Sequence, residues 1–297
     1  MESRVHLRVS GRGGSSSPRP ASLFASLFIV AILAAAAHAD AVLEQQSVPW
    51  ADAARYAAAR YSAANGNFTG RNYYSYCDIC PDHTLCRYYT QGAACRSGVS
   101  VSRPLQREEQ DEVVAAHNTV RWILATGEES RGSPGPQPSA ANMRLMWYDE
   151  ELAAIAQRWA DQCQFKHDTC RNVERFPVGQ NIYLERMTRP LKRPDWSKVV
   201  RKWYDEVAKH NGRQSLRPYR FSAVTGHFTQ LSWADTFLVG CGIAEYNDYY
   251  AGRRWNTRLY VCDYGPTGNV VGDWMYQTGE ACAHCGPESY CYYGLCV

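Results

Sequence analysis

Twelve cysteines constrain this chain of 297 residues more than any other feature of its sequence. In a secreted chain, an even number of cysteines is typical of a disulfide framework that forms in an oxidising compartment. Cys77 and Cys80, and likewise Cys282 and Cys285, have a C-x-x-C spacing, which leaves zinc coordination open as an alternative. The full set is Cys77, Cys80, Cys86, Cys95, Cys163, Cys170, Cys241, Cys262, Cys282, Cys285, Cys291 and Cys296.

The start of the chain has the order of a secretory signal peptide. Residues 21–39 form an apolar run that closes on Ala37-His38-Ala39, and four arginines precede it. A positive start, a short apolar core and an A-x-A end predict cleavage after Ala39. A membrane anchor is the alternative, because the run is near the minimum of about 18 residues for a spanning helix. We therefore expect a secreted, extracellular protein that lacks residues 1–39 and has no membrane span.

Removal of the leader changes the charge balance. The whole chain has 32 Lys and Arg against 29 Asp and Glu, and the leader holds four Arg and one Glu. The remaining chain therefore has 28 basic and 28 acidic residues, and its net charge is zero. Such a balance does not favour nucleic acid or an anionic membrane surface as an electrostatic partner.

Composition divides the chain after the leader into four regions. Residues 40–76 are rich in Ala, Asn and Tyr without a clear period, and we expect a flexible extension whose only glycosylation sequon is at Asn67. Residues 77–104 form a small cysteine knot, and residues 105–275 have the size of one domain. Residues 276–297 form a second cysteine cluster, too small to own a core without its disulfides.

The main domain mixes helical and strand patterns. Helical stripes are expected in residues 106–124, in residues 150–163 after Asp149, and in residues 196–207 after Asp195. Two later segments, 239–246 and 258–264, read as neighbouring strands that carry Cys241 and Cys262. A bridge between those two cysteines is the simplest pairing. The three prolines of residues 132–138 require a surface loop. Helices combined with a late antiparallel pair predict an α+β sandwich.

Four short motifs resemble the signatures of the CAP superfamily (cysteine-rich secretory, antigen 5 and pathogenesis-related proteins). Asp263, in the last of them, stands where the family usually has Asn. Residues 131–143 and 162–170 look specifically like the arthropod venom-allergen (antigen 5) branch, and the tail is similar to extensions of some arachnid and tick members. The resemblance covers about residues 77–275. The motifs are His117-Asn118-Thr119-Val120-Arg121, Gly179-Gln180-Asn181-Ile182, Gly226-His227-Phe228-Thr229-Gln230 and Tyr260-Val261-Cys262-Asp263-Tyr264.

The resemblance implies an α-β-α sandwich (CAP fold) with disulfide-stapled extensions at both ends. It also implies disulfide pairings that the spacing alone does not give. Each unstrained bridge stabilises the fold by about 2–4 kcal/mol. The implied pairs are Cys77–Cys86, Cys80–Cys170, Cys95–Cys163 and Cys241–Cys262, and the tail is expected to close as Cys282–Cys291 and Cys285–Cys296.

The resemblance further implies a central cleft lined by histidines and acidic residues. The matching positions are His167, His227 and Glu206, with Gln180 where many members have Glu. Two imidazoles and a carboxylate suit Zn²⁺, although an uncharged Gln weakens such a site. The alternative is a polar network in which Glu206 orients one imidazole and Gln180 bonds the other. No cofactor is required, and weak binding of Zn²⁺ or another divalent cation is the metal role we expect.

Other motif positions are interpreted as structural. His117, Asn118, Arg121 and Asn181 match family positions that tie the fold together by buried hydrogen bonds. A Ser-His-Glu protease has been suggested for some members, with Glu and Ser at positions that hold Gln180 and Arg186 here. Ser232 could be nominated instead as a nucleophile, but nothing in its spacing selects it. Catalysis is therefore not expected.

Three functions remain to be weighed. The first is a secreted, monomeric binding protein of venom, saliva or haemolymph that targets a small lipid, a sterol or an extracellular protein, and not nucleic acid. The second is a metal-dependent hydrolase that uses His167, His227 and Glu206. The third is a structural or immune-related extracellular module with an empty cleft. Because one scaffold supports many activities, the fold alone does not choose among them.

Overall fold

The computed structural model describes residues 50–65, 74–96, 101–212 and 218–297. The expected leader and Asn67 lie outside these residues. Among the helices that the structure describes, none combines the length and the hydrophobicity needed to cross a membrane.

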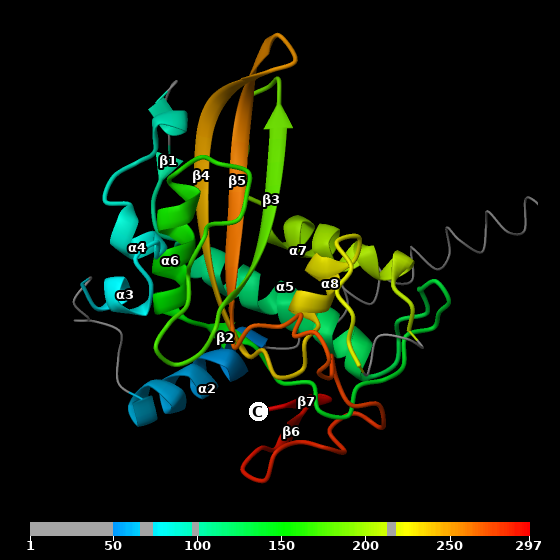
Figure 1. The fold of residues 1–297 in the computed structure, drawn as a ribbon. Coiled ribbons are helices and arrows are strands. Elements are labelled where there is room, and N and C mark those ends of the chain that lie inside the picture. Colours follow the sequence, from blue (N-terminus) through cyan, green and yellow to red (C-terminus); the bar gives the residue numbers. More distant parts are fainter. Residues whose placement is uncertain (1–49, 66–73, 97–100, 213–217) are drawn as a thin grey trace, which may run out of the picture. The chain divides into compact units, whose positions relative to one another are not determined.

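A five-stranded sheet forms the centre of the molecule (Figure 1). Its strands lie in the order β1 (Val101–Ser102), β4 (Leu238–Tyr250), β5 (Arg253–Gly265) and β3 (Gly179–Met187), and β2 (Trp147–Tyr148) pairs with β4 in parallel. β4 and β5 form one long hairpin whose register runs from Leu238↔Gly265 to Tyr250↔Arg253. The two expected strands are confirmed, and both are longer than the sequence pattern indicated.

One face of this sheet carries α6 (Glu150–Ala160), and the other carries α5 (Arg107–Ala125) and α7 (Trp196–Tyr204) (Figure 1). All three helices lie where the hydrophobic stripes predicted them. Asp149 and Asp195 cap α6 and α7 by accepting hydrogen bonds from Leu152 N and Lys198 N, as Asp side chains do at helix starts. The layers are therefore those of an α-β-α sandwich.

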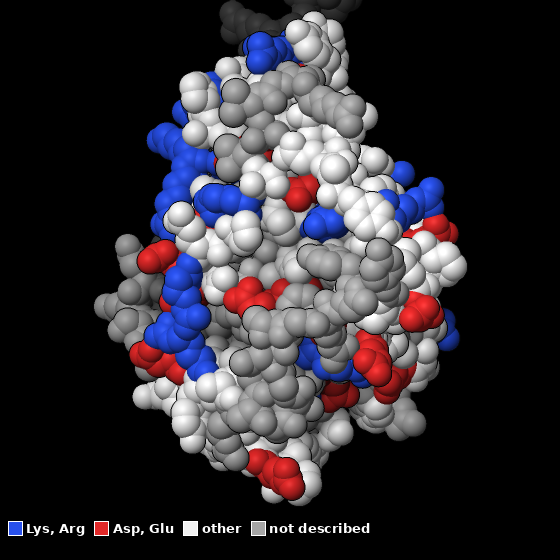
Figure 2. Space-filling view, turned by 90° about the vertical axis from the view of Figure 1, so that its left-hand side faces the viewer, with Lys and Arg blue, Asp and Glu red and all other residues white. Residues whose placement is uncertain are grey.

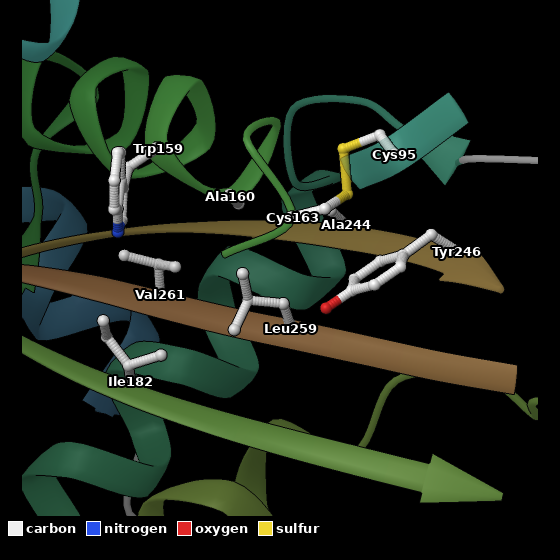
Figure 3. Packing of buried hydrophobic residues seen from close by; sticks show 10 residues of the cluster. Cys95, Trp159, Ala160, Cys163, Ile182, Ala244, Tyr246, Leu259 and Val261 are labelled. Carbon is white, nitrogen blue, oxygen red and sulfur yellow. A yellow bond between two sulfur atoms is a disulfide. The ribbon is translucent and has the colours of Figure 1, made fainter. Parts of the chain in front are cut away.

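Two glycines in β4 let α6 lie against the sheet. A Cβ at Gly240 would stand 2.1 Å from the backbone nitrogen of Ala153, and one at Gly242 would stand 2.3 Å from Cα of Gln157. No other residue fits at such distances without moving the helix. Trp159 of α6 packs with Ile182, Leu259 and Val261 of the sheet, beside the bridge of Cys95 and Cys163 (Figure 3).

All twelve cysteines are paired, in the six pairs that the sequence comparison implied. The knot comprises α3 (Tyr74–Ile79), α4 (Thr84–Arg87) and η1 (Ala93–Arg96). The sulfurs of Cys282, Cys285 and Cys296 lie within 4.8 Å of one another. They belong to disulfides, so they offer no thiolate to a metal, and the zinc alternative for the C-x-x-C pairs is wrong.

The region that was expected to be a flexible extension contains a helix, α2 (Trp50–Asn65). Its buried positions Trp50, Ala54 and Ala57 follow helical spacing, but two of them are alanines, so the hydrophobic stripe is weak in the sequence. α2 packs against α5 and β2. Tertiary contact, rather than a strong local pattern, therefore orders this segment.

The C-terminal tail adds the short hairpin of β6 (Cys291–Tyr292) and β7 (Leu295–Cys296). Main-chain hydrogen bonds join it to the loop before β2: Leu145 N donates to Cys296 O at 2.8 Å, and Cys296 N donates to Met143 O at 2.8 Å. Trp50 of α2 contacts the rings of Tyr292 and Tyr293 edge-on. The tail is thus an integral part of the folded body.

Candidate functional site

His227 and Glu206 form the first half of the site. His227 is the second residue of α8 (Gly226–Leu231), and Glu206 lies in η2 (Asp205–Lys209), directly after α7. The Nδ1 atom of His227 is 2.7 Å from Oε1 of Glu206. The other carboxylate oxygen accepts hydrogen bonds from the backbone N–H groups of His227, at 2.9 Å, and of Phe228, at 3.2 Å. Glu206 thus holds both the ring and the first turn of α8.

His167 and Gln180 form the second half. His167 lies in the loop after α6, and this loop is fixed where Trp159 Nε1 donates to Lys166 O at 2.7 Å. Nδ1 of His167 is 2.8 Å from Oε1 of Gln180, which is the second residue of β3. The ring is open to solvent on one side. Desolvation by the protein on its other side lowers the pKa of His167, and the charges of Arg171 and His227 act in the same direction.

The two halves meet around the start of β3, an edge strand of the sheet. Side chains alternate between the faces of a strand. Gln180 therefore holds His167 on one side, while the next residue, Asn181, donates to the backbone carbonyl of His227 at 3.1 Å. The structure shows these four residues as two hydrogen-bonded pairs, His167 with Gln180 and His227 with Glu206, and the segment at the start of β3 contacts both pairs. Among the described residues, His167, Glu206 and His227 do not place three ligand atoms within 4.8 Å of one another. We call His167, Gln180, Glu206 and His227 the two-histidine site.

Hydrogen bonding fixes which nitrogen of each ring carries the proton. Gln180 Nε2 donates to Asp168 and to Asp263, so its Oε1 is the atom that faces His167. A carboxylate accepts and does not donate. A ring in its neutral form therefore donates from Nδ1, and its Nε2 keeps the lone pair. Among the described residues, no hydrogen bond engages Nε2 of either ring.

Behind His167 lies a buried acidic group that the sequence interpretation did not include. Asp168 accepts from Arg171 Nε at 2.5 Å, from Gln180 Nε2 at 3.1 Å and from the hydroxyl of Thr84. Asp263 accepts from Gln180 Nε2 at 2.9 Å. Complete burial, together with the charge of Asp168, raises the pKa of Asp263 well above its usual range. The only signal in the sequence was Asp263 itself, an acid where relatives have an amide.

The other motif residues lie in the core near this site. Nε2 of His117 is 2.9 Å from the hydroxyl of Tyr264, and the amide of Asn118 exchanges two 2.8 Å hydrogen bonds with the backbone of Met146. Arg121 is completely buried, and burial lowers its pKa to about 9. Its guanidinium donates to carbonyls of the loop between α8 and β4 and to that of Arg144. These residues hold the segments around the site in place.

Two positions were considered for a nucleophilic serine, and neither suits that role. Ser232 is completely buried at the end of α8, where no substrate reaches its hydroxyl. Arg186 occupies the other position, and its guanidinium pairs with Asp248 in the β4–β5 hairpin. Among the described residues near the two imidazoles, no hydroxyl or thiol is hydrogen-bonded to either ring. Neither of the two positions therefore places a nucleophile beside an imidazole, which is the arrangement that covalent catalysis uses.

Comparison with known proteins agrees with this geometry. Residues 114–264 match the model of the "Cysteine-rich secretory protein family", CAP. The chain belongs to this family. Venom allergen 5 of Dolichovespula arenaria is 41% identical over 206 residues, which are 68% of this chain and 98% of the relative. Venom allergen 5 of Vespula pensylvanica is 41% identical over 196 residues, which are 66% of this chain and 93% of the relative.

Solved structures of the CAP family share the fold. The structure of BmVAL-1 matches with a TM-score of 0.53 and 27% identity, over 65% of this chain and 95% of that one. The crystal structure of Na-ASP-1 matches with a TM-score of 0.50 and 27% identity, over 70% of this chain and 50% of that one. The α+β sandwich and the antigen 5 branch expected from the sequence are thereby confirmed.

Proposed function

We propose that this CAP protein is a secreted, non-enzymatic binding protein whose two-histidine site holds a divalent cation of the Zn²⁺ class. One observation carries the proposal: both imidazoles donate from Nδ1 to a side-chain oxygen, so both keep the Nε2 lone pair for a ligand. Imidazoles that are held from the far nitrogen in this way are typical of zinc sites in proteins. Six disulfides fit an extracellular setting.

The donor set also limits the strength of the site. Glu206 already accepts from His227 and from two backbone N–H groups, and Gln180 is engaged at both ends of its amide. Two imidazole nitrogens therefore remain as protein ligands, whereas catalytic zinc sites use three and structural ones use four. We expect weak binding, with coordination positions left for water or for a donor group of a binding partner.

Hydrolysis by a bound metal is less well supported. A zinc-bound water needs a group beside it that can take its proton. Glu206 is the nearest candidate, but its carboxylate is occupied at both oxygens. A metal that is held by two imidazoles and presented at the surface fits binding better than turnover. Lipid or sterol binding stays a prediction that direct assays with lipid-depleted protein would test.

Zinc titration calorimetry tests the proposal. The parent protein should take up one Zn²⁺ with a dissociation constant in the micromolar range or weaker, and the variant His167→Ala/His227→Ala should take up none at this site. Gln180→Leu should bind at least about tenfold more weakly, because the ring of His167 loses the acceptor that fixes its tautomer. Equal uptake by the parent and by the double variant would rule the site out.

A matched control is available in the tail. His284 is an exposed histidine outside the two-histidine site, so His284→Ala should leave the zinc affinity unchanged. Peptide substrates supplied with each protein and with zinc test the hydrolase alternative. If the parent cleaves these peptides and the variant His167→Ala/His227→Ala does not, the assigned function is catalysis instead of binding.

A further inference from the structure

The end of the β4–β5 hairpin projects beyond the rest of the sheet (Figure 1). β3 pairs with β5 only as far as Met187↔Asn256, whereas β4 and β5 continue together through three more pairs to Tyr250↔Arg253. Ala251 and Gly252, with φ of 51° and 76°, close the turn. A positive φ at both central residues is typical of the tight turn that suits hairpins. We call residues 248–255 the hairpin tip.

The tip concentrates aromatic rings and arginines. Tyr249 and Tyr250 are 75% and 57% exposed, although large aromatic side chains usually bury most of their surface. Arg253 lies over the ring of Trp255 at 4.9 Å, and Arg186 lies over the ring of Tyr250 at 4.4 Å. Folding therefore leaves an apolar and cationic surface in water.

The charges of this region are unbalanced. Asp248 is the only acid of the tip, and Arg186 pairs with it. Arg253 and Arg254 are exposed, and so is Arg189, whose carbonyl accepts a hydrogen bond from Asn256 at the base of the tip. None of the ion pairs among the described residues includes these three arginines. Figure 2 shows Lys and Arg side chains at the upper end of the molecule, where the hairpin ends in Figure 1. The net charge of zero calculated for residues 40–297 is an average, so it does not reveal this local excess of arginines.

The arrangement of the two tyrosines indicates the shape of the partner. Directly opposed residues of a hairpin share a face, and successive residues alternate. Tyr250 therefore lies on the face of Arg253, and Tyr249 lies on the opposite face with Arg254. A linear polyanion along one face would reach one tyrosine and one arginine. A planar partner that contacts the end of the hairpin would reach both tyrosines and both arginines.

We propose that the hairpin tip docks on anionic phospholipid bilayers. Tyr and Trp rings favour the headgroup region of a membrane, and arginines beside them reach lipid phosphates and carboxylates while their stems cover apolar surface. The contact is peripheral, since the tip is a short two-stranded ribbon. This activity does not use the two-histidine site, and it is independent of the function proposed above.

Vesicle co-sedimentation tests the proposal with protein that is expressed from the whole coding sequence in a secreting host and purified from the medium. The parent should bind vesicles of phosphatidylcholine with phosphatidylserine and should not bind phosphatidylcholine alone. Arg253→Gln/Arg254→Gln should weaken binding roughly twenty-five-fold, because each arginine near an anionic surface contributes about a factor of five. Binding should also fall steeply at about 1 M salt, where the screening length is near 3 Å.

Two further variants separate the tip from general charge and aromatic effects. Lys202→Gln/Lys209→Gln removes two exposed cations from α7 and η2, and it should leave vesicle binding nearly unchanged. Tyr249→Ser/Tyr250→Ser keeps the charge and should still weaken binding. All these positions are exposed, and unchanged melting temperatures would confirm that each variant folds.

Three results would overturn the proposal. The parent protein could fail to bind the anionic vesicles. The arginine and lysine variants could lose binding equally, which would indicate net charge rather than the tip. The arginine variant could lose retention on heparin while its vesicle binding is unchanged, which would assign the tip to a sulfated polysaccharide instead.

Discussion

The cysteine knot near the N-terminus and the cysteine cluster at the C-terminus are attached to the sandwich in different ways. Two bridges tie the knot to the main domain, Cys80–Cys170 and Cys95–Cys163, across 90 and 68 residues of sequence. Both bridges of the tail are internal, across 9 and 11 residues. The tail is joined to the domain by backbone hydrogen bonds and by the buried side chain of Leu295.

This difference shows that disulfides in one chain can serve separate purposes. A long-range bridge restricts the whole unfolded chain, whereas a local one restricts only its own loop. The knot also contacts the segment that carries His167. Thr84 donates to Asp168, and Nε2 of His83 donates to the carbonyl of Asn172, at 2.9 Å, in the segment that carries His167. Among the described residues, no hydrogen bond or ion pair joins the tail to that segment, and its main-chain hydrogen bonds go to residues such as Ala141, Met143 and Leu145 instead.

The largest effect is expected from removal of a long-range bridge. Cys80→Ser/Cys170→Ser should lower the free energy of unfolding by about 4–5 kcal/mol, as the entropy of a 90-residue loop predicts. Zinc affinity should fall as well, because the segment with His167 loses its anchor. Denaturant unfolding and calorimetry measure the two effects. If the variant is as stable as the parent, the Cys80–Cys170 bridge does not stabilise the fold as proposed.

A smaller loss, about 3 kcal/mol, is expected from Leu295→Ala. Leu295 is completely buried in β7, which packs against α5, and truncation of a buried leucine leaves a cavity that costs 2–5 kcal/mol. Thermal unfolding should show the loss, while zinc affinity stays that of the parent. A change in zinc affinity would mean that tail and site are coupled after all.

Removal of a tail bridge should lower the free energy of unfolding by less than Leu295→Ala does. Cys282→Ser/Cys291→Ser opens a loop of 9 residues, for which chain entropy gives about 2–3 kcal/mol. Proteolysis should increase within residues 276–297 only. A loss as large as that of the Cys80 variant would contradict the distinction between local and long-range bridges.

The smallest effect concerns pH. Burial lowers the pKa of His83 in the knot, so on acidification the unfolded chain binds a proton near pH 6.5 before the folded one does. This contribution to stability is present above about pH 6.5 and is lost as the pH falls toward the lower folded pKa. His83→Asn, which keeps an oxygen for the cap of α4, should flatten the dependence of stability on pH. The exposed His284 of the tail, changed to Asn, should not alter it.

Parts of the fold could be predicted because their sequence patterns are strong. α6 buries Trp159, α7 buries Trp196 and Trp203, and each helix has buried residues at regular helical spacing after a capping aspartate. α2 could not be predicted, because Ala54 and Ala57 bury little surface and a neighbouring helix supplies its order. The lengths of β4 and β5 were underestimated at the polar end of the hairpin. The sequence there gives no strand pattern, and only pairing between the two strands extends them.

The sequence motifs named the residues of the candidate site, but they indicated only part of the hydrogen bonding among those residues. Family motifs gave His167, Gln180, Glu206 and His227, and the polar network considered as an alternative to a metal site is present. The network holds each ring at Nδ1, and zinc binding stays the proposal that the titration above tests. Asp168 could not be assigned from sequence, because its role depends on Gln180 reaching it and Asp263 together, and β3–β5 register decides that.

The amide of Gln180 has a direction that its neighbours enforce. Both of its hydrogens point to carboxyl oxygens, of Asp168 and of Asp263, and its oxygen points to His167. A glutamate at this position could only accept, so residue 263 would have to donate to it, either as a protonated carboxyl, which the raised pKa of Asp263 allows, or as an amide. We therefore expect positions 180 and 263 to vary together among relatives. Relatives should carry Gln with Asp or Glu with Asn, and mixed pairs should be rare among sequences that keep both histidines.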